Sequence, residues 1–342
     1  MAEVLSHPEF GYYMTREPFG REGDFITAPE VSQMFGELIG VWCADVWRRM
    51  GAPASLRLIE LGPGRGTLMV DILSALGAIP GALNAAEIHF VETSPRLRDQ
   101  QHDTLNRAGI GNAKWHERLA EVPDGPAIVV ANEFFDALPV RQYVHTAVGW
   151  CERLVGLNAA GNGFQFIVAD RPTHGANVLA PAVISAPMES IAEICPAGQA
   201  LISDIADRIN ENDGAALIID YGTATSAPGD SLQAVQNHRA IPVLVAPGSA
   251  DLTAHVDFSA LVRAAEAAGV AAHGPVTQGS FLESLGIELR ATALRQNATP
   301  EQSDDLDTAV ARLTAPDQMG DLFKVLALVR RDQLPPAGFS AP

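Results

Sequence analysis

The amino-acid sequence predicts an α/β fold in which helices cover a doubly wound, Rossmann-like sheet of mainly parallel strands. Three observations predict this fold. Apolar strands alternate with amphipathic helices between residues 56 and 131, a glycine-rich turn joins the first strand to the first helix, and the alternation returns between residues 198 and 329. Strands that alternate with helices are joined by right-handed crossovers, so they pair in parallel.

Residues 1–50 predict an arm followed by a helix. Residues 1–29 are rich in Gly, Pro and aromatic residues and lack the periodicity of a long regular element, so we expect an ordered arm or lid. From Glu30 onward, apolar residues recur at helical spacing, and Gly51 is a natural stop. The apolar residues are Phe35, Leu38, Ile39, Trp42 and Val46.

The first half of the core, residues 51–139, follows this helix. We expect strands at 56–61, 87–91, 113–116 and 127–131, with helices at 67–76 and 95–108. Residues 140–195 break the rhythm, because "RQYVHTAVGWCERLVGLNAAGNGFQFIVADRP" alternates apolar and polar residues around an "AAGNG" turn. This pattern predicts a region of antiparallel hairpins inserted into the domain.

The second half of the core, residues 196–335, resumes the alternation. We expect a helix near 198–210, a strand at 215–222, a helix at 257–268, a helical stretch at 279–313 and a last strand at 322–329. The loop 223–252 shows no clear structure and is long enough to suggest a function. Because no repeat or linker interrupts the chain, the arm and the hairpins are elaborations of one domain.

The composition limits the partners and the compartment. The formal charge of −18 should repel polyphosphate, so we expect no nucleic-acid partner; the acidity either attracts a basic peptide or serves solubility. Cys43, Cys151 and Cys195 have no metal-ligand spacing, which indicates reduced thiols and no metal site. The sequence shows neither a signal-peptide pattern nor an apolar run of about 20 residues, so we expect a soluble, cytoplasmic protein without a membrane span.

The glycine turn lies in "LIELGPGRGTLMVDIL", where the first strand ends and the first helix begins. Glycines at 62, 64 and 66 let backbone N–H groups approach a ligand at a helix N-terminus. A dinucleotide fingerprint, G-x-G-x-x-G, would need glycine at position 67, which is Thr67. The alternative is a tight structural turn that binds nothing.

The G-x-G-x-G spacing, preceded by Glu60, resembles the first motif of class I S-adenosylmethionine-dependent methyltransferases. That resemblance implies S-adenosyl-L-methionine as cofactor and S-adenosyl-L-homocysteine as product. Glu92 closes the second strand, where a carboxylate can accept both ribose hydroxyls. The expected cofactor-binding residues are Glu60, Gly62, Pro63, Gly64, Gly66, Thr67 and Glu92, with Thr27 and Pro29 from the arm.

Longer blocks of the sequence resemble the MidA-like family, whose mitochondrial members are the complex I assembly-factor arginine methyltransferases. The blocks include "GYYMTREPFGREGDFITAPEVSQMFGELIGVW", "VETSPRLRDQQ", "ANEFFDALPVRQ", "PGSADLTAHVDFSAL" and "TQGSFLESLGI". The resemblance implies a protein arginine methyltransferase that acts on a subunit of respiratory complex I or on its assembly. No transit peptide precedes the first block, which fits a bacterial member.

The block "ANEFFDALP" follows the fourth strand and supplies the candidate catalytic residues Asn132, Glu133 and Asp136. The carboxyl ends of parallel strands face the ligand crevice. A guanidinium has a pKa above about 12, and carboxylates can hold it bidentately and accept its proton. If a helix starts here, Glu133 and Asp136 share one face; alternatively, Asp136 only caps that helix.

Four further residues are candidates for the substrate side of the site: Asp24 and Glu30 in the arm, and Asp220 and Tyr221 at the end of the "LIID" strand. The arm sequence "TAPE" fits a lid over the cofactor, but equally a helix start with proline in its first turn. His255 and Asp257 fit a helix start better than an acid–base pair. Trp115 either flanks the adenine or packs in the core, and Arg65 points to solvent or lies at the mouth of the site.

Two alternative functions remain open from the sequence. One is an assembly chaperone in which the cofactor is structural, which predicts a crevice poor in carboxylates. The other is a small-molecule methyltransferase, which predicts a closed, apolar acceptor pocket in place of an open acidic groove. Neither the number of methyl groups transferred nor the oligomeric state is encoded in a motif.

Overall fold

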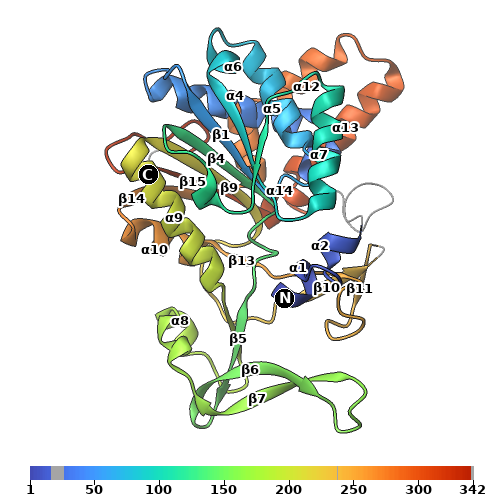
Figure 1. Cartoon of the computed structure of the whole chain (residues 1–342), viewed down its shortest axis with the longest axis vertical. Coiled ribbons are helices and arrows are strands. Elements are labelled where there is room, and N and C mark those ends of the chain that lie inside the picture. The colour runs from blue at the N-terminus through green and yellow to red at the C-terminus, as the bar shows by residue number, and fades with distance from the viewer. Residues whose placement is uncertain (17–26, 237, 340–342) are drawn as a thin grey trace.

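The computed structural model describes residues 1–16, 27–236 and 238–339. Its centre is an eight-stranded sheet in the order β14-β15-β9-β4-β1-β2-β3, with β13 beside β9 (Figure 1). The strands are β1 (Leu56–Leu61), β2 (Ala86–Val91), β3 (Lys114–His116), β4 (Ala127–Asn132), β9 (Gly214–Thr223), β13 (Val256–Asp257), β14 (Val270–Thr277) and β15 (Phe323–Arg330). Neighbouring strands are parallel in the part of the sheet made by β1, β2, β3, β4, β9 and β13. Strand β15 is antiparallel to both of its neighbours, β9 and β14. The predicted mainly parallel α/β sheet is confirmed.

Helices cover both faces of this sheet and make two apolar cores. One core contains residues of α4 (Gln33–Arg49), α5 (Thr67–Gly77), α6 (Ala82–Ala85), α7 (Pro95–Arg107), α11 (Gln278–Leu285), α12 (Ile287–Arg295) and α13 (Pro300–Thr314). The other contains residues of α9 (Pro196–Asn212), α10 (Phe258–Ala267) and the 3-10 helix η1 (Leu119–Glu121). The chain is therefore a three-layer sandwich, with α14 (Met319–Leu322) leading into β15.

Two smaller sheets and three short helices surround the carboxyl edge of the parallel strands. Antiparallel strands β5 (Arg141–Thr146), β6 (Gly149–Leu157), β7 (Phe164–Pro172) and β8 (Ile191–Ile194) form a sheet below the core in Figure 1, with η2 (His174–Val178) and α8 (Pro181–Ile184) between β7 and β8. Strands β10 (Gln233–Gln236), β11 (Arg239–Ile241) and β12 (Asp251–Thr253) form the other sheet. The N-terminal helices are α1 (Ala2–Ser6), α2 (Tyr12–Thr15) and α3 (Ala28–Val31).

Three expectations about single elements were wrong. Strand β14 was not predicted: it contains Gly274 and Pro275, which weaken a strand pattern, and it lies at the edge of the sheet with an irregular register. The loop 223–252 holds β10, β11 and β12, whose three or four residues are too few to show periodicity. No helix follows β4; a turn does. Within the described ranges, we find no helix long and apolar enough to cross a membrane.

Candidate cofactor and acceptor site

The turn between β1 and α5 has the backbone that its glycines predict. Gly62, Gly64 and Gly66 have φ of +60°, +53° and +81°, a region that favours glycine. At Gly62 a β-carbon would also lie 2.6 Å from Cδ2 of Phe134, so that position has no room for a side chain. The turn therefore holds its backbone open at the N-terminus of α5, where a ligand can approach closely.

Two hollows meet at this turn. The first is lined by the N-terminal helices, the turn and the segments after β2 and β4, including Leu5, Ser6, Tyr13, Glu92, Leu97 and Phe134. The second is lined by the arm, the turn and the end of β4, including Thr27, Pro29, Glu30, Glu60, Asn132 and Thr67. Both are lined by Gly62, Gly64 and Glu133, so the two form one continuous site.

Glu92 lies at the end of β2 in the first hollow and is held by a network that the sequence did not reveal. Its carboxylate accepts the Ser94 N–H at 2.8 Å and the Gln101 side-chain amide at 3.2 Å. The same Gln101 amide donates to the Gly64 carbonyl at 2.8 Å, and Trp115 Nε1 donates to the Gln101 carbonyl oxygen at 2.8 Å. Gln101, on α7, thus joins the glycine turn to the carboxylate expected to hold the ribose.

We expect Gln101→Leu to weaken cofactor binding about tenfold, or about 1.4 kcal/mol, because this fully buried amide holds the Gly64 carbonyl and the Glu92 carboxylate in place. Calorimetric titration with S-adenosyl-homocysteine measures this loss. Asn106→Ala, an exposed change on the same helix, is the control. An affinity equal to that of the control would exclude Gln101 from cofactor positioning.

In the second hollow, the buried oxygens Glu60 Oε2 and Asn132 Oδ1 have no hydrogen-bond partner among the residues that the structure describes. Burial raises the pKa of Glu60, and an unpartnered buried carboxylate oxygen is costly unless a ligand donates to it. An ammonium group, such as that of the amino-acid part of S-adenosylmethionine, is the donor that these oxygens fit. With the open turn and Glu92, the described residues fit this cofactor.

The arm lies against this end of the site. The Ala28 N–H donates to Glu133 Oε1 at 2.9 Å, and the Thr67 hydroxyl donates to Glu30 Oε1 at 2.8 Å. Arg65 forms an ion pair with Glu30 at 3.7 Å, so it lies at the mouth of the site while remaining partly exposed. Thr27 and Pro29 line the hollow as α3 begins, so the helix-start and lid interpretations of "TAPE" are compatible. Asp24 lies outside the described residues.

Glu133 is the carboxylate common to both hollows. Its backbone has a φ of +49°, which is unusual for a residue with a side chain and typical of strained functional positions. Burial raises its pKa to about 7, with Asp136 adding charge repulsion and the Ala28 N–H opposing the rise. Asn132 donates to Glu133 Oε1 at 3.3 Å, so Asn132 orients this carboxylate. Glu133 is therefore poised to exchange a proton near neutral pH.

Asp136 is buried behind Glu133, and burial raises its pKa to about 6. The Tyr221 hydroxyl donates to Asp136 Oδ2 at 2.7 Å, while Oδ1 has no hydrogen-bond partner within residues 1–16, 27–236 and 238–339. Because no helix follows β4, Asp136 caps no helix, and the alternative that it only caps one was wrong. The turn that follows β4, and not a shared helical face, therefore sets the position of Asp136 relative to Glu133.

Asp220 has a role different from the one expected. It is fully buried, and its Oδ2 accepts the N–H groups of Phe134, Phe135 and Asp136 at 2.9–3.2 Å. Burial, with the charges of Asp136 and Glu133, raises the pKa of Asp220, and the N–H groups of Asp136 and Tyr221 oppose the rise. Asp220 therefore holds the turn that carries the candidate catalytic residues, and it lines neither hollow. Tyr221, on the same strand, donates its hydroxyl to Asp136, and like Asp220 it lines neither hollow.

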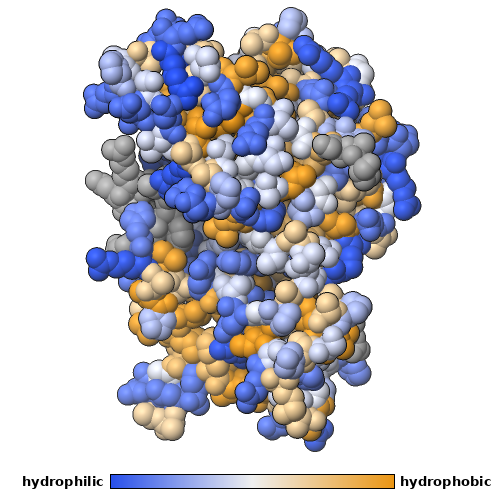
Figure 2. Space-filling model, turned by 180° about the vertical axis from the view of Figure 1, so that it is seen from behind, coloured by the Kyte–Doolittle hydropathy of each residue, from blue (hydrophilic) through white to orange (hydrophobic). Residues whose placement is uncertain are grey.

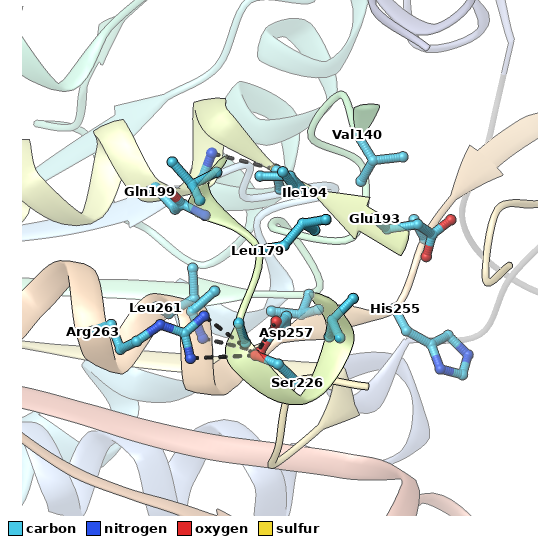
Figure 3. Close-up of a pocket in the computed structure, with 18 of the residues that line it drawn as sticks. Val140, Leu179, Glu193, Ile194, Gln199, Ser226, His255, Asp257, Leu261 and Arg263 are labelled. Atoms are coloured by element: carbon cyan, nitrogen blue, oxygen red, sulfur yellow. Dashed lines mark hydrogen bonds between the residues drawn. The ribbon is translucent and has the colours of Figure 1, made fainter. Parts of the chain in front are cut away.

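The remaining sequence candidates have structural roles. Figure 3 shows a neighbouring hollow in which Arg263 donates to Ser226 and Ser226 donates to Asp257 at 2.6 Å. Asp257 caps α10 by accepting the Ala260 N–H at 3.0 Å, and His255 points away from this group (Figure 3). The helix-start interpretation is confirmed. Trp115 stacks on His102 at 3.7 Å between ring centroids and does not line either hollow.

Comparison with known proteins identifies similar sequences and a similar structure. Residues 38–276 match the family described as "Putative S-adenosyl-L-methionine-dependent methyltransferase". The Drosophila melanogaster protein named "Protein arginine methyltransferase NDUFAF7 homolog, mitochondrial" is 38% identical over 99% of this chain and 84% of its own length. Its Homo sapiens counterpart, "Protein arginine methyltransferase NDUFAF7, mitochondrial", is 36% identical over 98% and 80%. A Burkholderia thailandensis protein crystallised with S-adenosyl-homocysteine superposes with a TM-score of 0.85 at 30% identity, covering 99% of this chain and 88% of that one.

Proposed function

The chain belongs to this family of S-adenosyl-L-methionine-dependent methyltransferases, and from that premise we propose that it methylates an arginine side chain of a protein. The choice of arginine as acceptor rests on the names of the relatives, which are protein arginine methyltransferases. The site gives an independent reason to expect a cationic acceptor. Glu30, Glu60 and Glu133 line the second hollow, and Asp136 is buried close enough to Glu133 to repel its charge. This carboxylate-rich crevice disfavours both the structural-cofactor chaperone and an apolar small-molecule pocket.

The observation that carries the proposal is the pair Glu133 and Asp136 beside the glycine turn. When bound, the cofactor supplies a methyl group on a positively charged sulfur. The carboxylate of Glu133 holds the acceptor guanidinium beside the glycine turn and fixes the orientation of the reacting ω-nitrogen. Glu133 takes the proton that this nitrogen loses, and Asp136 keeps a second negative charge close to the cationic acceptor. Pro29 and Thr27 cover this end of the site against water.

We expect kcat/KM to rise with pH through about 7 and then to level off. Burial raises the pKa of Glu133 to about 7, so below that pH the free enzyme carries the protonated acid, which cannot accept a proton, and above it the active carboxylate. Methylation rates measured from pH 5.5 to 9 at limiting acceptor test this. A rate independent of pH over this range would contradict the assignment of Glu133 as the base.

The proposal extends to the acceptor and the compartment. We propose a subunit of respiratory complex I, or a protein of its assembly, as the acceptor, because the sequence resembles the MidA-like family over most of its length. We propose a reducing compartment, the bacterial cytoplasm, because Cys43, Cys151 and Cys195 are all free thiols and two of them are buried.

Labelling a lysate tests the proposed function. The purified protein is incubated with isotopically labelled S-adenosylmethionine and a lysate from a strain that lacks it, and labelled peptides are sequenced by mass spectrometry. The expected result is label on an arginine of one or a few proteins. Label that appears only in small molecules would support the small-molecule alternative, and cofactor binding without any transfer would support the chaperone.

A further inference from the structure

Another large hollow lies outside the cofactor site. Its empty volume is about 1,070 Å³, it is open to solvent, and it runs between α1 and the β6–β7 hairpin over the β10–β12 sheet. We call it the apolar groove. Most of the residues that line it are apolar, among them Val4, Phe10, Val155, Phe164, Phe166 and Leu252.

The hairpin presents one apolar face to this groove. Val155 lies opposite Phe166 and Leu157 lies opposite Phe164 in the antiparallel register, and opposite residues point to the same side of a ribbon. Val155 is 55% exposed, Phe164 is 47% exposed, and Phe10 on the opposite wall is 68% exposed. Figure 2 shows hydrophobic side chains gathered over the lower part of the molecule, where the inserted sheet and the N-terminal helices lie. Exposed apolar surface of this extent marks interaction sites.

Helix α1 separates the groove from the cofactor site. Val4 lines the groove, whereas Leu5 and Ser6, the next residues along the helix, line the first hollow beside Glu92. The β10–β12 sheet also lies between the groove and the cofactor site. Leu252 lines the groove. Its neighbour Asp251 accepts a hydrogen bond from the hydroxyl of Tyr13, which lines the first hollow. The groove and the methyl-transfer site are therefore the two sides of one wall.

Resting on the proposed function, we propose that the apolar groove binds the acceptor protein through an apolar segment next to the methylated arginine. A helix is about 10 Å across. An extended chain covers that distance in about three residues. A segment bound in the groove therefore needs only a few more residues to pass α1 toward the hollow that Glu133 lines. The acceptor segment is cationic where it meets the carboxylates and apolar where it meets Val155 and Phe164.

A second copy of this chain fits the groove less well. Each copy carries a formal charge of −18, so two copies repel each other, whereas a cationic acceptor is attracted to the acidic site beside the groove. An arginine side chain alone also offers little contact area. An apolar anchor supplies affinity and selects one acceptor among many arginine-containing proteins.

Val155→Asp and Phe164→Ser test the proposal, with Leu289→Asp as the control. Leu289 is 79% exposed on α12 and does not line the groove. Each variant first has its S-adenosyl-homocysteine affinity measured by calorimetry, which should equal that of the wild type because neither groove residue lines the cofactor hollow. Each is then incubated with labelled cofactor and the lysate of the deletion strain.

We expect the two groove variants to label the acceptor at least tenfold more slowly than Leu289→Asp. With the acceptor that mass spectrometry identifies, KM should rise at least tenfold for the intact protein. KM should stay unchanged for a three-residue peptide centred on the arginine, which is too short to reach the groove.

Three results would overturn the proposal. Groove variants that label the intact acceptor as fast as the control would show that the groove does not bind it. A wild-type dimer in light scattering that Val155→Asp separates would show that the groove holds a second copy. Absence of arginine labelling by the wild type would refute the proposed function itself, and with it this inference.

Discussion

Glu133→Gln should reduce methyl transfer by a factor on the order of a thousand while leaving cofactor affinity within a few fold of the wild type. The amide keeps the shape of the side chain and an oxygen that accepts the Ala28 N–H, which holds the arm at 2.9 Å. It removes the negative charge that holds the guanidinium and the group that accepts its proton. The loss should therefore fall on the rate, measured with saturating cofactor, and not on S-adenosyl-homocysteine binding.

Asp45→Asn is a matched control for this change, because Asp45 is a partly exposed carboxylate on α4, far from the glycine turn in sequence, that forms an ion pair with Arg49. It should leave both rate and affinity unchanged. If Glu133→Gln methylates the acceptor at the wild-type rate, Glu133 is not the base, and Asp136 becomes the first candidate. If it loses cofactor affinity instead, the role of Glu133 is to hold the arm and the cofactor.

Gly64→Val should abolish detectable cofactor binding, a loss of at least a hundredfold. Gly64 lines both hollows and has a φ of +53°, which a β-branched residue adopts only with strain of about 1–3 kcal/mol. The valine side chain would also occupy space at the turn that the ligand approaches. Calorimetric titration with S-adenosyl-homocysteine measures the loss, and thermal unfolding shows whether the domain remains folded.

Gly111→Val is the matched control, because an added β-carbon at Gly111 meets nothing within 4 Å and its φ is not in the strained region. It should bind the cofactor as the wild type does. Undiminished affinity in Gly64→Val would show that the turn does not contact the ligand. A variant that no longer unfolds cooperatively would be replaced by Gly64→Ala, for which a smaller loss in the same direction is expected.

The sequence was sufficient for the parallel part of the sheet and for the cofactor. The predicted bounds of β1 agree with the structure, and those of β2, β4 and β9 differ from it by no more than one residue at either end. Each is a mainly apolar segment of the chain next to turn residues, a signal that depends only on neighbours in the chain. The spacing of Gly62, Gly64 and Gly66 is also a local signal, because it concerns the backbone of a single turn. It distinguishes the methyltransferase motif from the dinucleotide-binding motif.

The tertiary structure decided which residues cooperate across the chain. Gln101 has no pattern that marks it, and its role appears only when α7 lies beside the turn that carries Gly64. Asp220 and Glu133 are both acidic residues at strand ends in the sequence; only the pairing of β4 with β9 buries one beneath the turn and leaves the other facing the hollows. The apolar groove joins residues more than a hundred positions apart. Local patterns therefore determined the fold and the cofactor, whereas burial and long-range hydrogen bonds, which no local pattern encodes, decided the roles of the individual carboxylates.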